Sequence, residues 1–100
     1  MHALVLIRKV SDGNRSRFEI VAEILRKLRE PTGKTNLMSY CNMNFTQSGQ
    51  YLNYMKSNGL IQTDAMAGKV TYQRTKVGRD FLDLYNKMVL LLDPNIPASL

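Results

Sequence analysis

The sequence predicts a mainly α-helical fold with a small β-wing: a winged helix-turn-helix that carries an added C-terminal dimerisation helix. Three observations predict it. Two short helical segments flank a tight turn between Lys34 and Leu60, two short strand-like runs follow directly, and a strongly apolar helical segment comes last. The 100 residues are enough for one domain with a modest core.

We expect four parts along the chain. They are an N-terminal extension or strand at 1–14, a winged helix-turn-helix at 15–75, a dimerisation helix at 76–92 and a tail at 93–100. The first part contains the apolar run Ala3–Ile7, which is much too short to span a bilayer. Its composition fits a strand, an extension of uncertain order, or a segment that covers a partner.

The first helix is predicted to begin after Ser16, because Ser16 and Glu19 have the spacing of a capping box. Pro31 is expected to stop it, since proline cannot continue a helix. One apolar stripe at helical spacing is expected to face the core; it comprises Ile20, Val21, Ile24, Leu25 and Leu28.

The second helix is predicted at about Lys34–Cys41 and the third at about Phe45–Asn58. Asn44 and Gln47 form a second capping box, and Gly59 supplies the left-handed residue that ends the third helix. The two helices and their turn have the layout of a helix-turn-helix. The expected inward residues are Leu37, Met38, Cys41, Ser48, Leu52 and Met55.

A β-hairpin is predicted after the third helix. The runs 60–63 and 70–74 are the expected strands, and the glycine-containing stretch 64–69 is expected to be a flexible loop between them. Directly after a helix-turn-helix, such a hairpin is a wing.

The last helix is predicted at 76–92, capped by Thr75 and ended by Asp93-Pro94. Val77 opens an apolar stripe with alternating spacings of four and three, the period of a coiled-coil seam. A second stripe lies beside it, so the apolar surface is wider than one small domain covers. We therefore expect a dimer interface made by Phe81, Leu82, Leu84, Tyr85, Met88, Val89, Leu91 and Leu92.

The composition is basic. Fourteen Lys and Arg oppose eight Asp and Glu, for a net charge of +6 and a pI near 9.7, which favours a polyanion as partner. Cys41 is the single cysteine, so a reducing cytoplasmic setting is expected. The single histidine is His2, and no motif with metal-ligand or phosphate-loop spacing occurs. We expect no enzyme activity, no catalytic residue, no cofactor and no metal.

Two sets of residues are candidates for contacts with DNA. Uncharged side chains on the outer face of the third helix suit base edges, since Gln and Asn bond adenine in the major groove; they are Thr46, Gln47, Gln50, Asn53 and Tyr54. Residues at helix ends and on the wing suit phosphates; they are Lys34, Thr35, Lys56, Lys69, Arg74 and Lys76, with Arg15 and Arg17 as weaker candidates.

Four stretches carry a resemblance to a known family: 15–25, 34–45, 49–52 and 75–82. Over residues 15–92 the chain resembles the small basic archaeal winged-helix DNA-binding proteins, the chromatin-associated ten-kilodalton Sulfolobus type. The resemblance implies a homodimer joined by long C-terminal helices in an antiparallel coiled coil, with two wings and two recognition helices facing duplex DNA. This chain departs from that pattern by the early Pro94 and the extra segment Ala3–Val10.

The expected function is double-stranded DNA binding by a dimeric winged-helix transcription regulator or chromatin-organising protein, cytoplasmic and nucleoid-associated, with no membrane partner. The alternative is a winged-helix protein-interaction or assembly module that does not bind DNA. The six methionines, the aromatic residues Tyr51 and Tyr54, and the apolar last helix support that alternative.

Overall fold

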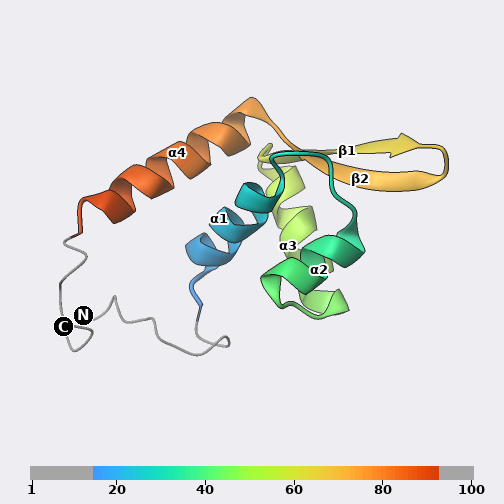
Figure 1. Cartoon of the computed structure of the whole chain (residues 1–100), viewed down its shortest axis with the longest axis horizontal. Helices are drawn as coiled ribbons and strands as arrows, with labels where there is room; N and C mark the ends of the chain where they lie inside the picture. The colour runs from blue at the N-terminus through green and yellow to red at the C-terminus, as the bar shows by residue number, and fades with distance from the viewer. Residues whose placement is uncertain (1–14, 93–100) are drawn as a thin grey trace.

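The computed structural model describes residues 15–92. The expected extension or strand at 1–14 and the tail at 93–100 lie outside the described residues. The predicted order of elements is confirmed (Figure 1): α1 (Arg17–Lys27), α2 (Lys34–Cys41), α3 (Phe45–Ser57), β1 (Ile61–Met66), β2 (Lys69–Arg74) and α4 (Lys76–Leu90).

Helix α1 begins at the predicted capping box. The Ser16 hydroxyl accepts from the backbone N–H of Glu19 at 3.1 Å, and the Glu19 carboxylate accepts from the backbone N–H of Ser16 at 2.8 Å. The helix ends at Lys27 with Leu28 as its cap, before Pro31 is reached. All five residues of the predicted apolar stripe are buried.

Helices α2 and α3 are joined by the predicted tight turn. Asn42 ends α2 in the left-handed conformation, with φ 55°. The Asn44 carboxamide then accepts from the backbone N–H of Gln47 at 2.7 Å, and the Gln47 side chain accepts from the backbone N–H of Asn44 at 3.3 Å. Helix α3 ends one residue earlier than predicted, and Gly59 follows with φ 76°.

The wing is a two-stranded antiparallel sheet, and the prediction of a flexible loop at 64–69 was wrong. The pairing runs from Ile61 opposite Arg74 to Met66 opposite Lys69, so only two residues remain for the turn. Those residues, Ala67 and Gly68, both have positive φ, 54° and 79°. A tight turn of this kind matches the twist of the strands and lets them pair up to their tip.

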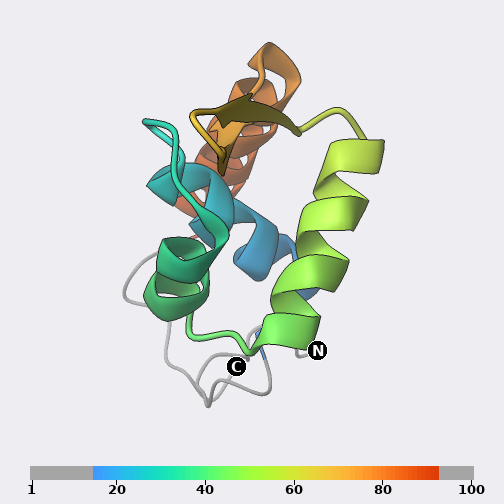
Figure 2. The ribbon, with the colours of Figure 1, turned by 90° about the vertical axis from the view of Figure 1, so that its right-hand side faces the viewer.

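A short bridge ties the wing to the helices. Thr32, in the connection between α1 and α2, exchanges two backbone hydrogen bonds with Tyr72 of β2, at 3.1 and 2.9 Å. Figure 2 looks at the molecule from the wing: α3 forms one flank, α2 lies on the other side, and the hairpin, seen nearly end-on, points toward the viewer.

The core lies between α1, α2, α3 and the start of β1, and α4 closes it with Leu82. Helix α4 begins at the predicted cap, where the Thr75 hydroxyl accepts from the backbone N–H of Gly78 at 3.1 Å. It ends at Leu90 rather than at residue 92. The following backbone bond, from Leu92 to Val89, has three-residue spacing, a tightened last turn before the proline. No helix within residues 15–92 is long and apolar enough to cross a membrane.

Candidate nucleic-acid interface

The outer face of α3 is open along its length. The five base-contact candidates lie on that face, and all are exposed. The opposite face holds Ser48, Leu52 and Met55, which are buried in the core. The capping box and the core contacts therefore fix the direction in which the polar face points (Figure 2).

The base-contact candidates differ in how they are held. The side-chain oxygen of Gln47 is occupied by the N-terminal cap of its own helix. The side chains of Gln50 and Asn53 form no hydrogen bond within the described residues. Gln50 and Asn53 thus have the donor and acceptor pair that bidentate contact with adenine requires.

Lys34 lies where α2 meets the start of α3. Its ammonium group is 3.6 Å from the centroid of the Phe45 ring. Gly49 leaves room for it, since a Cβ at that position would lie 3.4 Å from the Lys34 nitrogen. Phe45 is itself 68% exposed. This cation–π contact holds a positive charge beside the first turn of α3, next to the exposed Thr35.

Arg74 is predicted to contact phosphate, and the structure shows that it also makes a contact within the protein. Its guanidinium donates to the backbone carbonyl of Leu25 at 3.0 Å, in the last turn of α1. This carbonyl also accepts from the backbone N–H of Leu28 at 3.1 Å, so the guanidinium adds a second donor and places a cation at the negative end of the helix dipole. Arg74 therefore holds the base of the wing against α1. The sequence could not show this, because the two residues are far apart in the chain.

The other phosphate candidates remain on the surface. Lys69 is exposed at the tip of the wing, and Lys56 is exposed near the end of α3. Lys76 is also exposed, although its ammonium group lies 3.2 Å from the carboxylate of Asp80. A solvated pair of this kind is weak, so Lys76 still contributes positive charge at the surface.

Arg15 joins two helices. Its guanidinium pairs with the carboxylate of Glu23 and donates to the backbone carbonyl of Cys41 at 2.7 Å, at the end of α2. The Cys41 side chain is buried, as expected for a thiol acting as a small apolar group. Burial raises the pKa of that thiol to about 11, and the charge of Glu23 adds to the effect.

The tip of the wing carries exposed apolar residues that were not among the candidate site residues. Met66 is 71% exposed and lies opposite Lys69 in the register, while Val70 is 52% exposed. Met66 and Val70 stand on either side of the turn in the sequence, but a loop at 64–69 would not hold them together at the tip of a hairpin. The tip thus combines an apolar surface with one positive charge.

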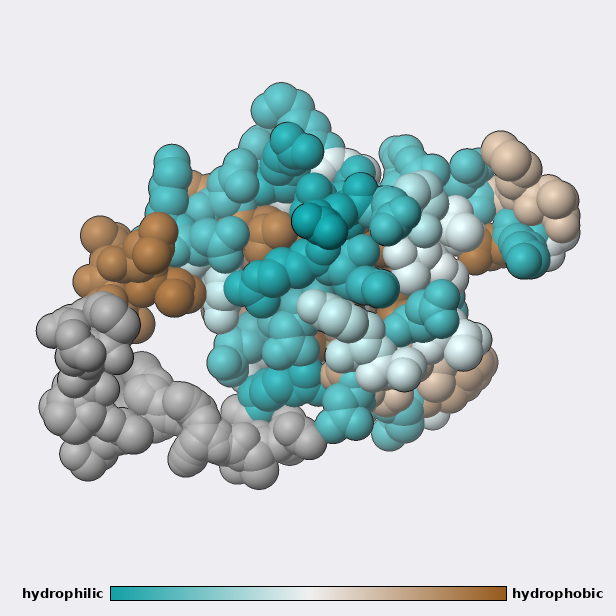
Figure 3. All heavy atoms as spheres, viewed as in Figure 1, coloured by the Kyte–Doolittle hydropathy of each residue, from teal (hydrophilic) through white to brown (hydrophobic). Residues whose placement is uncertain are grey.

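Helix α4 divides the predicted dimer interface in two. Leu82 is buried in the core of its own domain, and Phe81 and Tyr85 pack against that core. The remaining predicted residues are exposed, and they gather toward the C-terminal end of α4, where Figure 3 shows a hydrophobic patch. This α4 patch comprises Leu84, Met88, Val89, Leu91 and Leu92, with Leu90 beside it.

Comparison with known proteins identifies the family. A family model described as winged helix-turn-helix matches residues 14–92. The chain belongs to the winged helix-turn-helix family. A comparison with curated protein sequences finds no match.

Solved structures share this winged helix-turn-helix fold at low sequence identity. Sso10a-2, a DNA-binding protein from Sulfolobus solfataricus, is 19% identical, with a TM-score of 0.71 over 77% of this chain and 81% of that one. The transcriptional regulator BldR, also from Sulfolobus solfataricus, is 17% identical, with a TM-score of 0.60 over 77% of this chain and 64% of that one.

The fold also occurs within an enzyme. Human N-acetylserotonin methyltransferase is 19% identical to this chain, with a TM-score of 0.54 over 63% of this chain and 19% of that protein. Among the residues described here, no group of three or more His, Cys, Asp or Glu side chains could hold a metal ion. Function must therefore be argued from the side chains of this winged helix-turn-helix rather than from the fold.

Proposed function

We propose that the protein binds double-stranded DNA as a homodimer and acts as a transcription regulator or a chromatin-organising protein in the cytoplasm, at the nucleoid. Helix α3 enters the major groove and the wing follows the backbone. One observation carries this proposal: an exposed, uncharged, hydrogen-bonding face on α3 has the cations Lys34 and Lys56 at its two ends, and Lys69 lies exposed at the tip of the wing. The proposal assigns the protein no catalytic residue, cofactor or metal.

The two kinds of side chain have different tasks. The net charge of +6 supplies affinity through phosphate contacts and the release of counterions, whatever the sequence of the DNA. Gln50 and Asn53 supply discrimination between bases, because their amides match the edge of adenine. A regulator depends on both, whereas a chromatin-organising protein needs mainly the first.

Two substitutions separate these tasks. Gln50→Ala should cost about 1–3 kcal/mol on a preferred site and little on random duplex. Lys69→Ala should weaken binding to both by a similar factor and reduce the salt dependence. Lys87→Ala is the matched control, since it removes the same charge from α4. Equal loss from the Lys69 and Lys87 variants would show that net charge alone acts and would count against a wing contact.

The dimer is proposed from the α4 patch. Leu91 is 84% exposed and Leu92 62% exposed, although a helix that is apolar on all sides needs cover on several sides. A second α4 running antiparallel offers the matching surface. The double substitution Val89→Asp and Leu92→Asp changes exposed residues only, so the domain should stay folded while the dimer dissociates. A wild-type monomer at micromolar concentration in sedimentation would contradict the dimer.

DNA affinity should fall with the dimer, because two linked sites bind far more tightly than one. The second candidate function is an assembly module without DNA binding. The apolar wing tip, with Met66 and Val70 exposed, is the observation that favours it. A protein that dimerises but binds no duplex at low salt would support that candidate.

A further inference from the structure

Two adjoining depressions lie beside the outer face of α3, between α3 and the start of α1. The first, of about 350 Å³, is lined by Arg17, Gln50, Tyr51 and Tyr54. The second, of about 220 Å³, is lined by Arg17, Phe18, Val21, Tyr54, Asn58, Leu60 and Phe81. Arg17 and Tyr54 line both, so the two depressions adjoin at these side chains, and the pair is called the groove below.

The walls of this groove are aromatic. Phe18 is 59% exposed, and its ring stacks on Phe81 with the centroids 6.4 Å apart. The ring of Tyr54 bounds both depressions. Flat apolar rings facing solvent offer stacking area to a planar ligand.

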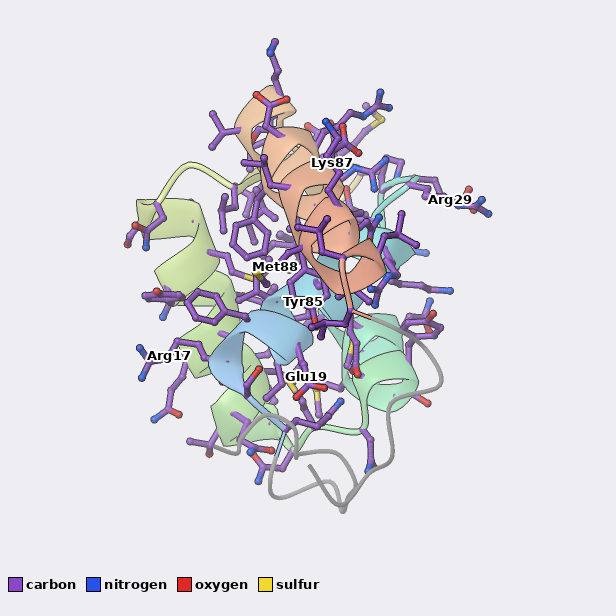
Figure 4. All side chains as sticks on the ribbon, turned by 90° about the vertical axis from the view of Figure 1, so that its left-hand side faces the viewer. Arg17, Glu19, Arg29, Tyr85, Lys87 and Met88 are labelled. Carbon is purple, nitrogen blue, oxygen red and sulfur yellow. The ribbon has the colours of Figure 1, made fainter. Side chains whose placement is uncertain are left out.

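One positive charge lies in the groove without an acidic partner. The Arg17 guanidinium is 5.8 Å from the centroid of the Tyr54 ring and forms no ion pair within residues 15–92. It is also in the first turn of α1, where the helix dipole disfavours a cation. An anion bound at Arg17 would relieve that repulsion. Figure 4 shows Arg17 on the side of α1 nearer α3, with Arg29 on the far side of the molecule.

We propose that this groove binds a planar aromatic carboxylate. The ring of the ligand packs against Phe18 and Tyr54, and its carboxylate pairs with the guanidinium of Arg17, which suits two parallel hydrogen bonds. Gln50 and Asn58 supply the few polar groups that orient such a ligand.

Binding here would regulate DNA binding, a consequence that rests on the proposed function. Gln50 and Tyr54 belong both to the groove and to the exposed face of α3. A ligand in the groove covers these two side chains. Ligand and DNA therefore compete, and each lowers the affinity for the other by the same factor.

The first experiment contains no DNA. Fluorescence anisotropy of naphthoate, an aromatic carboxylate, is measured against the whole protein, with neutral naphthamide as the matched ligand. Naphthoate should bind saturably. Arg17→Gln should weaken it roughly tenfold, as loss of a charge-assisted hydrogen bond does. Arg29→Gln removes the same charge elsewhere and should leave binding unchanged. Phe18→Ser should weaken both ligands, and circular dichroism checks that each variant is folded.

Three results would overturn the site: no saturable binding at millimolar naphthoate, naphthamide binding as tightly as naphthoate, or Arg17→Gln binding like the wild type. A fourth result would also overturn it. If naphthoate does not bind, and Arg17→Gln loses as much DNA affinity as Lys69→Ala does, then Arg17 contacts DNA phosphate rather than a ligand.

The second experiment adds duplex DNA. Naphthoate, but not naphthamide, should lower the DNA affinity of the wild type. Unchanged DNA affinity at saturating naphthoate would overturn the regulatory role. Failure of the protein to bind DNA would count against the proposed function alone, since the first experiment decides the groove without DNA.

Discussion

Gly78 is predicted to be essential for seating α4 on the wing and α1. A Cβ at this position would lie 2.1 Å from the backbone oxygen of Leu60, where ordinary contacts begin at 3.4 Å. Alanine therefore forces the two backbones apart by more than 1 Å. That shift breaks the hydrogen bond from the Thr75 N–H to the same oxygen, which is 3.1 Å long.

The expected loss follows from three contributions. Overpacking lowers the free energy of unfolding by about 1–3 kcal/mol, and a lost hydrogen bond lowers it by about 0.5–1.5 kcal/mol. Replacing glycine by alanine within a helix raises it by about 1 kcal/mol. Gly78→Ala should thus lower the free energy of unfolding by about 2 kcal/mol, and Tm by about 10 °C for a domain of this size.

Gly49→Ala provides the control, because it is the same substitution inside another helix. The nearest atom to its new Cβ is the end of the flexible Lys34 side chain, at 3.4 Å. Alanine at Gly49 should therefore stabilise the protein by about 1 kcal/mol. Both values come from urea denaturation followed by circular dichroism. A Gly78→Ala variant as stable as the wild type would refute the close approach of α4 to Leu60.

The remaining predictions concern stability. Arg74→Gln should lower the free energy of unfolding by about 1–3 kcal/mol, because the Leu25 carbonyl of α1 loses its charged donor and keeps only the N–H of Leu28, whereas Lys69→Ala should change it by less than about 0.5 kcal/mol. Asn44→Ala should lower the free energy of unfolding by about 1 kcal/mol, because the cap of α3 is lost. Asn53→Ala should leave that free energy unchanged in the same denaturation assay, because the Asn53 side chain forms no hydrogen bond in the described part of the chain. The Cys41 thiol keeps its proton to a pKa of about 11 when folded, against an ordinary value of 9.0, so stability should fall as pH rises through that window. Cys41→Ala should lessen that fall, and an unchanged slope would contradict it.

Local rules in the sequence predicted most of the helical structure. The capping boxes at Ser16 and Asn44 depend on residues three positions apart, and the apolar stripe of α1 depends on helical spacing alone. The polar face of α3 followed from the same spacing once the helix began at Phe45. Such features are visible in sequence because the interacting residues are neighbours in the chain.

The features that the sequence did not predict are contacts between residues far apart in the chain. The hydrogen bond from Arg74 to Leu25 joins β2 to α1, so no local pattern around Arg74 predicts it. The glycine and polar residues of 64–69 predict a loop, but strand pairing up to Met66 overrides that composition. The apolar spacing of α4 predicts Leu82 at a dimer interface, whereas the structure buries Leu82 in its own domain, because one helical stripe does not reveal which part that domain covers.

The groove beside Arg17 could not be predicted from the sequence either. It exists only because the start of α1 packs next to the end of α3 and beside Phe81 of α4. In the sequence, Arg17 is a candidate for phosphate and Tyr54 for base contacts, and no local pattern connects the two. The cation–π contact between them is a property of the packed structure.

The salt dependence of duplex DNA binding tests the central claim most directly. If about 4 to 6 phosphates are neutralised per protomer, the affinity of the wild-type protein for a duplex should fall by orders of magnitude between about 50 and 200 mM salt. The account predicts that fall, with a shallower slope for Lys69→Ala. Binding that stays constant across the salt series, or no binding at the lowest salt, would contradict it.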